Sequence, residues 1–368
     1  MLDFASALYL DMRHDDLSPT VGWPLTLGRP AALEEPPGAA SVGAALASLQ
    51  GCEKALMMTS TLHVFWDLFE MLSRTPSAML VDGCTYPVSR WAMSRMAGCG
   101  CQVSGFGHHN FGRLKALTAS AIAGGRRPVL VTDGYCGACG RSPPIREYVA
   151  LADAVDGLLV VDDTQGLGVL GSGPVPSMPY GRGGGGALRW HGVSGPRIIV
   201  GASLAKAFGA PLAVISGGES LIGQYRDASR TRVHCSPPSA AAIRAAQAAL
   251  RMNDQRGDAL RRSLLERVKL LREAMARAGL RACSAFPFPM QHFDVPPHVD
   301  APALCRRLFE RNVWSVPTRS GRGGRLTFLV SVRHSPREIE KAGRIVADVL
   351  STHVMLGRKE NRDEQAFI

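Results

Sequence analysis

The chain has 368 residues, of which 46% are hydrophobic and 20% are charged, enough to bury one large core and one smaller one. No apolar run reaches the roughly 18 residues that a membrane helix needs, and the N-terminus lacks a basic segment followed by an apolar stretch. We therefore expect a cytoplasmic protein of two domains that does not cross a membrane.

The formal net charge is +11 at pH 7, which suits an anionic partner such as nucleic acid, coenzyme A or an acidic carrier protein. Charge alone does not choose among these three. The arginines are scattered, no dense block of lysine and arginine occurs, and only 6% of the residues are aromatic. Because nucleic-acid binding needs a basic patch, often with interleaved aromatic rings, we expect no nucleic-acid partner.

Nine cysteines in a chain of this length give neither the density nor the shortness of a disulfide scaffold, so reduced thiols are expected. Cys136 and Cys139 have the CxxC spacing of redox and zinc sites. No second CxxC and no nearby pair of histidines completes such a site along the chain. The sequence therefore predicts no metal site and favours a structural role for both cysteines.

Short apolar runs closed by polar residues or glycine alternate with stretches of helical periodicity. The runs are typical of buried parallel strands covered on both faces, and the alternation predicts an α/β domain with right-handed crossovers. The expected strands are residues 77–81, 128–132, 157–161, 197–200 and 211–216. The expected helices are residues 41–49, 62–72, 113–123, 145–154 and 239–278.

From about residue 281 the elements become shorter and predict a small α+β domain, with strands at 290–295 and 326–332 and helices at 301–312 and 336–350. The segment 180–195 contains GRGGGG, which predicts a mobile loop. We expect four regions: an N-terminal segment near the active site at 1–35, a large domain at 36–265, a small C-terminal domain at 266–356, and a flexible tail at 357–368.

The segment LVVDDTQGLG is a buried strand that ends in Asp162 and Asp163 and then turns through glycines. In α/β sheets ligands bind at the carboxyl ends of strands. A carboxylate at that position can keep a pyridinium nitrogen protonated, which makes a cofactor ring an electron sink. This role is assigned to Asp162, and capping of the following turn to Asp163.

Lys206 lies in a turn of small residues between two apolar strands, in RIIVGASLAKAFGAPLAVISGG. Apolar surroundings disfavour the charged form of an amine, and the neutral form is the one that attacks an aldehyde. A lysine in such a turn is a weak signal by itself. Together with LVVDDTQGLG about forty residues earlier, this lysine indicates a cofactor site.

Asp162, Lys206 and the motifs around them resemble those of the α-oxoamine synthase family of pyridoxal-phosphate (PLP) enzymes, and the resemblance covers nearly the whole chain. LVVDDTQGLGVLG is similar to the family's VDDAHGTGVLG, and SLAKAFG to its TFGKGFG; these two stretches are the most diagnostic. FASALYLDM, ALMMTSTLHVFWDLFEML, VDGCTYPVSR, HHN and VTDGYCGACGR also keep register with family motifs. The resemblance implies fold type I, in which a large domain with a mixed, mostly parallel seven-stranded sheet is joined to a small α+β domain.

The resemblance also implies a role for each matching residue. Lys206 matches the lysine that binds the cofactor covalently, Asp162 the acid at the ring nitrogen, and Tyr86 the side chain that stacks on the ring. Ser203 matches a hydroxyl that binds the cofactor phosphate, together with the amides of Ser60, Thr61 and Leu62 at a helix start. Ser236 matches a hydroxyl that reaches the phosphate from the neighbouring subunit, which implies a homodimer with shared active sites.

Five positions depart from the family pattern: Tyr86 replaces a histidine that stacks on the ring, Gln165 a histidine at the ring hydroxyl, Gly137 a serine, Ala7 an asparagine, and Thr327 the arginine that holds the substrate carboxylate. Gln165 can donate the hydrogen bond but cannot titrate. Either a displaced arginine holds the carboxylate or the substrate is not a simple α-amino acid. Candidates for that arginine are Arg325, Arg333 and Arg232, each of which is more simply explained as a surface charge.

Among these three, Arg325 is preferred because it lies two residues from Thr327, on the same strand face. His109 and His234 are the preferred candidates for a further acid or base in the pocket. His63 falls within an amphipathic helical pattern and is interpreted as a packing residue.

The reaction that these features favour is carbon–carbon bond formation at the α-carbon of an amino acid by condensation with an acyl-coenzyme A or acyl-carrier thioester, in a specialised biosynthetic pathway. The basic charge suits such a partner. An alternative keeps the cofactor but changes the reaction to transamination, aldol-type cleavage or side-chain elimination and replacement. A third possibility is a non-catalytic homologue, against which the retained Lys206, Asp162 and Ser203 argue.

Overall fold

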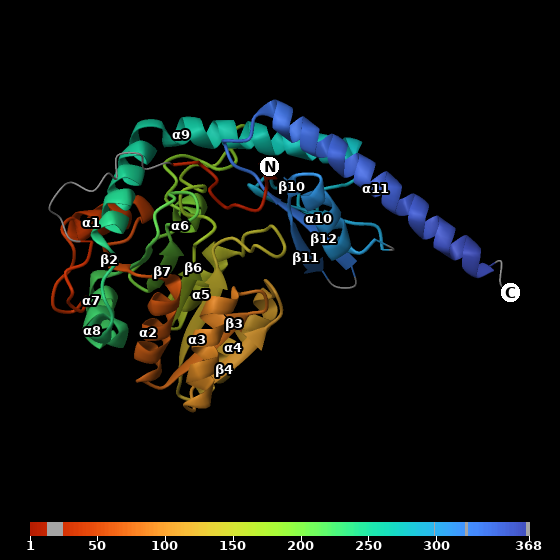
Figure 1. Ribbon diagram of the computed structural model, residues 1–368. Coiled ribbons are helices and arrows are strands. Elements are labelled where there is room, and N and C mark those ends of the chain that lie inside the picture. The colour runs from red at the N-terminus through yellow and green to blue at the C-terminus, as the bar shows by residue number, and fades with distance from the viewer. Residues whose placement is uncertain (13–24, 298, 321–322, 366–368) are drawn as a thin grey trace. The chain divides into compact units, whose positions relative to one another are not determined.

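The computed structural model describes residues 1–12, 25–297, 299–320 and 323–365 (Figure 1). The chain divides into two compact units, a larger one of residues 12–136 and 142–258 and a smaller one of residues 1–11, 137–141 and 259–368. The division after Asp258 and the boundary expected after residue 265 both lie within the long helix α9 (Ala240–Arg277).

The larger unit contains a seven-stranded sheet whose strands follow one another in the order β2, β8, β7, β6, β5, β3, β4. Strand β8 pairs antiparallel with both of its neighbours, and the other four pairings are parallel. The expected α/β class and mostly parallel sheet are thereby confirmed. The strands are β2 (Lys54–Met58), β3 (Ser77–Asp82), β4 (Gln102–Phe106), β5 (Arg127–Asp133), β6 (Leu158–Asp162), β7 (Ile198–Ser203) and β8 (Ala213–Gly217).

Helices cover both faces of this sheet. Because side chains alternate along a strand, Met79 and Val81 of β3 join one apolar cluster while Ala78 and Leu80 join the other. The first cluster includes α2 (Thr61–Ser73), α3 (Pro87–Gly98) and α7 (Glu219–Ala228), and the second includes α4 (Phe111–Ala123), α5 (Ile145–Ala154) and α6 (Ala187–His191). Cover on both faces explains why the central strands are apolar throughout.

Several elements of the larger unit were not predicted from the sequence, and for two of them, β4 and α3, the physical reason is clear. Strand β4 is an edge strand in which four of five residues are partly exposed, so its QVSGF sequence lacks an apolar run. Helix α3 begins with Pro87 as its first residue and has a weak apolar face. Strand β2, helix α1 (Ala39–Gln50) and helix α8 (Arg230–His234) complete the unit with the first half of α9.

The smaller unit contains a three-stranded antiparallel sheet in the order β11 (Val316–Ser320), β12 (Gly323–Leu329), β9 (Met290–Asp294). Strand β1 (Leu2–Asp3) pairs in parallel with β10 (Val313–Trp314). The rings of Phe4 and Phe293 pack edge-on against Phe328 at centroid distances of 5.5 and 5.9 Å. With α10 (Ala301–Glu310) and α11 (Pro336–Gln365), these strands form the expected α+β architecture.

Helix α11 continues to Gln365, beyond the end expected at residue 350. The helices in the described parts of the chain all lack an apolar stretch sufficient to span a bilayer.

The glycine-rich segment is more regular than expected, and its prediction as a mobile loop is wrong. It contains α6, and its backbone is tied to the chain after β6 by hydrogen bonds from Gly168 N to Gly184 O and from Gly186 N to Leu170 O, both 2.7 Å. A β-carbon at Gly185 would collide with the carbonyl oxygen of Leu49. Glycine is needed here for close backbone approach, which composition does not distinguish from flexibility.

Gly185→Ala is therefore expected to lower the free energy of unfolding by about 2–3 kcal/mol, because the added methyl group forces two backbone segments apart. The midpoint of urea unfolding measures the effect. Gly223→Ala is the matched control, since Gly223 lies in α7 with open space where its β-carbon would be. Equal midpoints for the two variants would contradict the packing role of Gly185.

Candidate active site

Three neighbouring parallel strands of the large sheet each end in an aspartate: β3 in Asp82, β5 in Asp133 and β6 in Asp162. Asp133 and Asp162 are register partners, and Asp82 and Asp162 are only 1% and 6% exposed. Because parallel strands end at the same edge, the three carboxylates gather there; we call them the acid edge. The pattern that singled out LVVDD also occurs in AMLVD and VLVTD, where the sequence analysis passed over it.

Two acids of this edge, Asp162 and Asp133, resist ionisation. Burial raises the pKa of Asp162, while hydrogen bonds from Thr164 and attraction to Lys206 oppose the shift. Burial also raises the pKa of Asp133 to about 8, with repulsion from Asp162 and Asp82 adding to it. A cationic group placed at this edge would relieve both penalties, so the edge suits the protonated ring nitrogen of PLP.

Lys206 lies in the tight connection between β7 and β8. The turn is held by hydrogen bonds from Ala210 N to Leu204 O at 3.1 Å and from Gly209 N to Lys206 O at 3.2 Å. Gly209 has a φ of 60°, a conformation that favours glycine. Burial lowers the pKa of Lys206, and attraction to Asp162 partly offsets this. The fold thus brings the two predicted residues into electrostatic contact and leaves the amine more readily deprotonated than an exposed lysine.

Thr164, which the sequence analysis did not select, connects Asp162 with Ser203. Its backbone amide donates to Asp162 Oδ1 at 3.1 Å, and its Oγ1 accepts from Ser203 N at 3.1 Å. The Ser203 hydroxyl oxygen accepts from Ala205 N at 3.2 Å, an arrangement that lets its O–H donate to a phosphate oxygen.

Helix α2 begins at the same edge and offers a second set of donors. Ser60 is its N-cap and accepts from His63 N at 3.4 Å, and the amides of Thr61 and Leu62 belong to the first turn, which has no helical acceptors. Backbone amides at a helix start bind phosphate, so these residues fit the role expected of them. His63 Nδ1 lies 2.8 Å from Ser60 Oγ, so His63 contacts the N-cap of its own helix, and its interpretation as a packing residue stays a prediction.

Ser236 lies beside this helix start within the same chain, because Thr59 Oγ1 donates to the Ser236 carbonyl oxygen at 3.1 Å. Its expected contact with the phosphate of a neighbouring subunit stays a prediction. Tyr86 is 52% exposed at the start of α3, and its backbone amide donates to Asp133 Oδ1 at 3.1 Å. This hydrogen bond places Tyr86 at the acid edge with an accessible ring. Gln165 is half-buried in the turn after Asp162.

Asp163 has a structural role. Its Oδ2 accepts from Ala187 N at 2.8 Å at the start of α6, and it also accepts a backbone hydrogen bond from Gly166 in the turn after β6. Burial raises its pKa to about 8. The capping role expected for Asp163 is confirmed, and it extends to the glycine-rich segment.

Within the smaller unit, Thr327 belongs to a buried polar network that the sequence did not predict. Its Oγ1 lies 2.7 Å from His292 Nδ1 and 2.8 Å from Thr318 Oγ1, and His292 Nε2 lies 2.6 Å from the carbonyl oxygen of Gly137. Burial lowers the pKa of His292. Two of the positions that depart from the family pattern, Gly137 and Thr327, are thus joined through one histidine.

The three candidate arginines are all paired with carboxylates of their own unit. Arg325 and Arg333 stay partly exposed, which is compatible with their interpretation as surface charges, whereas Arg232 is buried and does not fit it. The pairs are Arg325 with Asp294 at 2.7 Å, Arg333 with Asp3 at 2.5 Å, and Arg232 with Glu35 at 2.6 Å. Arg232 is only 5% exposed. Arg325 lies on the sheet face that carries Thr327, because alternate residues of a strand such as β12 share a face. To bind a substrate carboxylate, Arg325 must first give up its ion pair with Asp294.

The two candidate histidines differ in position. His109 has a φ of 55°, its backbone amide donates to Asp82 Oδ2 at 2.9 Å, and its ring packs on His108 at a centroid distance of 3.6 Å. His109 therefore belongs to the acid edge. His234 is exposed at the end of α8, and the described residues show no contact between its ring and the three carboxylates.

Comparison with known proteins identifies the family of the chain. The profile of the family described as aminotransferase class I and II matches residues 32–343, and the chain belongs to this family. An 8-amino-7-oxononanoate synthase of Dechloromonas aromatica is 30% identical over 253 residues, which cover 67% of this chain and 62% of the relative. Another, from Chromobacterium violaceum, is 28% identical over 320 residues, covering 85% of this chain and 72% of the relative. The resemblance to α-oxoamine synthases is thereby confirmed.

Solved structures agree on the fold. A serine palmitoyltransferase from S. paucimobilis with a bound PLP adduct of myriocin has a TM-score of 0.80 at 14% identity, covering 96% of this chain and 88% of that one. The 8-amino-7-oxononanoate synthase of Francisella tularensis has a TM-score of 0.74 at 17% identity, covering 96% and 99%. The fold is PLP-dependent transferase fold type I, as expected.

Proposed function

We propose that the protein is a PLP-dependent transferase that joins an amino acid, at its α-carbon, to an acyl group delivered as a coenzyme A or carrier-protein thioester. The observation that carries the proposal is the pair formed by the buried Asp162 and the half-buried Lys206 at the acid edge, in a chain whose relatives include 8-amino-7-oxononanoate synthases. The matched part of the Dechloromonas relative is less than two thirds of its length. The substrates are therefore argued from the residues.

The residues of the larger unit divide the work of holding the cofactor. Ser203 and the amides of Thr61 and Leu62 bind its phosphate, Tyr86 covers its ring, and Gln165 donates to its ring hydroxyl. PLP supplies an aldehyde for the substrate amine and a ring that draws electrons from the α-carbon.

Two residues carry the proton chemistry. With PLP bound, Asp162 would stay ionised beside the protonated ring nitrogen, because that cation would offset the cost of burial. Lys206 would hold the cofactor through Nζ and would serve as the group that accepts the α-proton of the substrate. Burial lowers the pKa of Lys206, which favours the neutral amine that both roles need.

The substrates are expected to differ from those of the biotin-pathway synthases. The cofactor residues are retained, whereas Ala7, Gly137 and Thr327 depart from the family pattern. Arg325 is the proposed ligand of the substrate carboxylate, with Thr327 beside it on β12. The net charge of +11 suits coenzyme A or an acidic carrier protein. We further propose a homodimer with shared active sites in the cytoplasm.

Two departures from the family pattern favour a second candidate function. Gln165 cannot titrate, and no arginine occupies position 327, so a PLP reaction without a thioester, such as transamination, aldol-type cleavage or side-chain elimination, is the alternative.

Incubation of the holoenzyme with a panel of amino acids and acyl-coenzyme A thioesters tests the choice. Because the chain itself has nine cysteines, free coenzyme A is quantified by chromatography rather than with a thiol reagent. We expect its release only when both substrates are present. Amino-acid consumption without coenzyme A release would overturn the synthase in favour of the alternative.

A further inference from the structure

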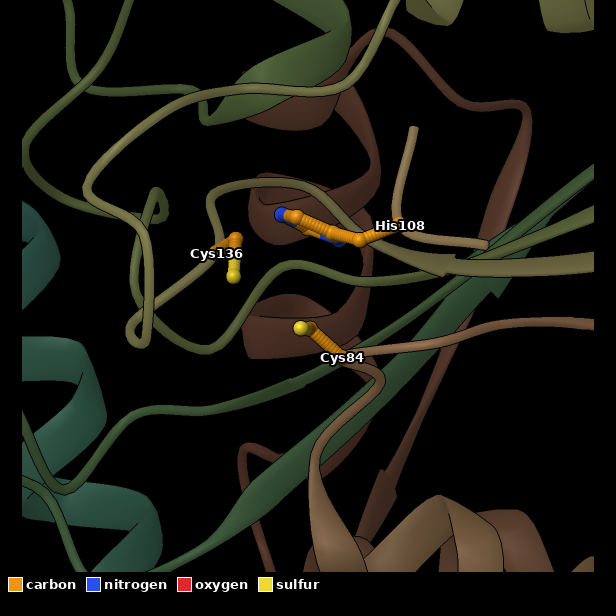
Figure 2. Close-up of side chains that lie close together, drawn as sticks. All are labelled: Cys84, His108 and Cys136. Carbon is orange, nitrogen blue, oxygen red and sulfur yellow. The ribbon is translucent and has the colours of Figure 1, made fainter. Parts of the chain in front are cut away.

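Three residues with metal-binding side chains meet in the larger unit: Cys84, His108 and Cys136 (Figure 2). One ligand atom of each lies within 4.8 Å of the others. Figure 2 shows the three side chains converging from three separate segments of the chain. The residues are 24 and 28 positions apart, which matches no zinc motif, and for this reason the sequence analysis expected no metal here.

The sheet topology explains the meeting. Strands β5, β3 and β4 are neighbours, and each supplies one of the three residues shortly after its carboxyl end. Cys84 follows Asp82 by two positions, and Cys136 follows Asp133 by three. Because the strands are parallel, the residues that follow them are brought together above one edge of the sheet. Cys136 was interpreted as structural for want of nearby ligands along the chain; the fold supplies them from two other strands.

Asp82 orients this cluster. Its Oδ1 accepts from His108 Nδ1 at 2.7 Å and from the backbone amide of Cys84 at 3.0 Å, and its Oδ2 accepts from His109 N at 2.9 Å. A buried carboxylate that accepts from Nδ1 selects the tautomer whose Nε2 has the lone pair. Metal-bound histidines are held by a carboxylate in this way. The second carboxylate oxygen fixes the loop that carries the imidazole.

We propose that Cys84, His108 and Cys136 bind a zinc ion. Two thiolates and one imidazole are ligands that Zn²⁺ prefers. In a tetrahedral site such ligand atoms are roughly 3.5–3.8 Å apart. Side-chain shifts of about 1 Å therefore bring the three ligand atoms to the distances that zinc coordination needs. The ion balances the charge of two thiolates, and the site can then be buried beside Asp82 without added net charge. Three protein ligands leave the fourth position for water or a substrate atom.

The three proposed zinc ligands are not among the residues proposed to hold PLP, although Asp82 belongs to the acid edge. The test of the zinc site does not use catalysis. The holoenzyme is freed of metal with a chelator, returned to buffer and titrated with Zn²⁺ against a chromogenic competitor. We expect about one equivalent per chain. Cys84→Ser, Cys136→Ser and His108→Ala are each expected to weaken binding by at least about 100-fold, and Asp82→Asn by about 10–100-fold.

The matched control is Cys99→Ser, which removes an exposed thiol of the same unit at the end of α3. It is expected to bind zinc as the wild type does. Substitution of Co²⁺ for Zn²⁺ adds a second measurement, since thiolate ligation produces a near-ultraviolet charge-transfer band in the difference spectrum. This band should disappear in Cys136→Ser and persist in Cys99→Ser.

Melting temperatures identify the variants that remain folded, and His108→Ala tests the site without altering either thiol. Failure of the wild type to bind an equivalent of zinc, or equal binding by wild type and His108→Ala, would overturn the proposal. Loss of binding in Cys99→Ser alone would also overturn it, because the metal would then lie elsewhere. None of these results bears on the reaction, so this proposal and the proposed function can fail independently.

Discussion

Lys206→Ala is expected to remove the covalent link to PLP and to lower turnover by on the order of 10⁴-fold or more, since one side chain supplies both the nucleophile and the base. Borohydride reduction of the wild-type holoenzyme should fix the cofactor to the peptide that contains Lys206 and bleach the visible band. The variant should show neither the mass increase nor the bleaching. Its stability should not fall, because it no longer buries an amine whose charged form is disfavoured.

Lys115→Ala is the matched control, since Lys115 lies on α4 of the same unit with its Nζ near the ring of Phe111. It should retain the visible band and turnover. A visible band in Lys206→Ala that borohydride still bleaches would show that another amine binds the cofactor, and the proposed function would lose its central residue.

Asp162→Asn is expected to lower turnover by about 10²–10³-fold, because a neutral amide cannot stabilise the positive charge at the ring nitrogen. The folded protein should be at least as stable as the wild type, since the change replaces a buried carboxyl whose ionisation is unfavourable with a neutral group of the same shape. Kinetics and thermal unfolding measured together distinguish loss of chemistry from loss of structure.

The same substitution should shift the pKa of Lys206. Attraction to Asp162 favours the ammonium form and so raises the pKa that burial lowers; without the carboxylate the pKa should fall further. In cofactor-free protein, the pH dependence of Lys206 methylation should move to lower pH. Asp163→Asn is the matched control, because Asp163 binds the α6 start and the turn at Gly166. Equal losses of turnover in the two variants would contradict a specific role for Asp162.

Prediction succeeded where a function depends on a local pattern. A strand that ends in an acid, and a lysine between two apolar strands, can both be recognised within about ten residues, and the sheet then places them together. The same rule, applied to every strand, would also have found Asp82 and Asp133. Edge strand β4 and helix α3 were missed because partial exposure weakens the periodicity on which recognition depends.

Prediction failed where partners lie far apart along the chain. The ion-pair partners of Arg325, Arg333 and Arg232 were not predicted, because nothing local to these arginines indicates Asp294, Asp3 or Glu35. Glycine composition indicated flexibility in GRGGGG, whereas the carbonyl of Leu49, distant in sequence, requires a residue without a side chain at Gly185. The polar network of His292, Thr327 and Thr318 likewise depends on three strands pairing in one register.

The sequence by itself therefore determined the α/β class, the mostly parallel sheet, and the pair of Asp162 and Lys206, because each leaves a signature in consecutive residues. Only the tertiary structure decided which acids share an edge, which arginines are paired, and that Cys84, His108 and Cys136 meet. The physical reason is the sheet: β5, β3 and β4 are adjacent in it but are separated along the chain by the helices α3 and α4, so residues after their carboxyl ends become neighbours only when the sheet assembles.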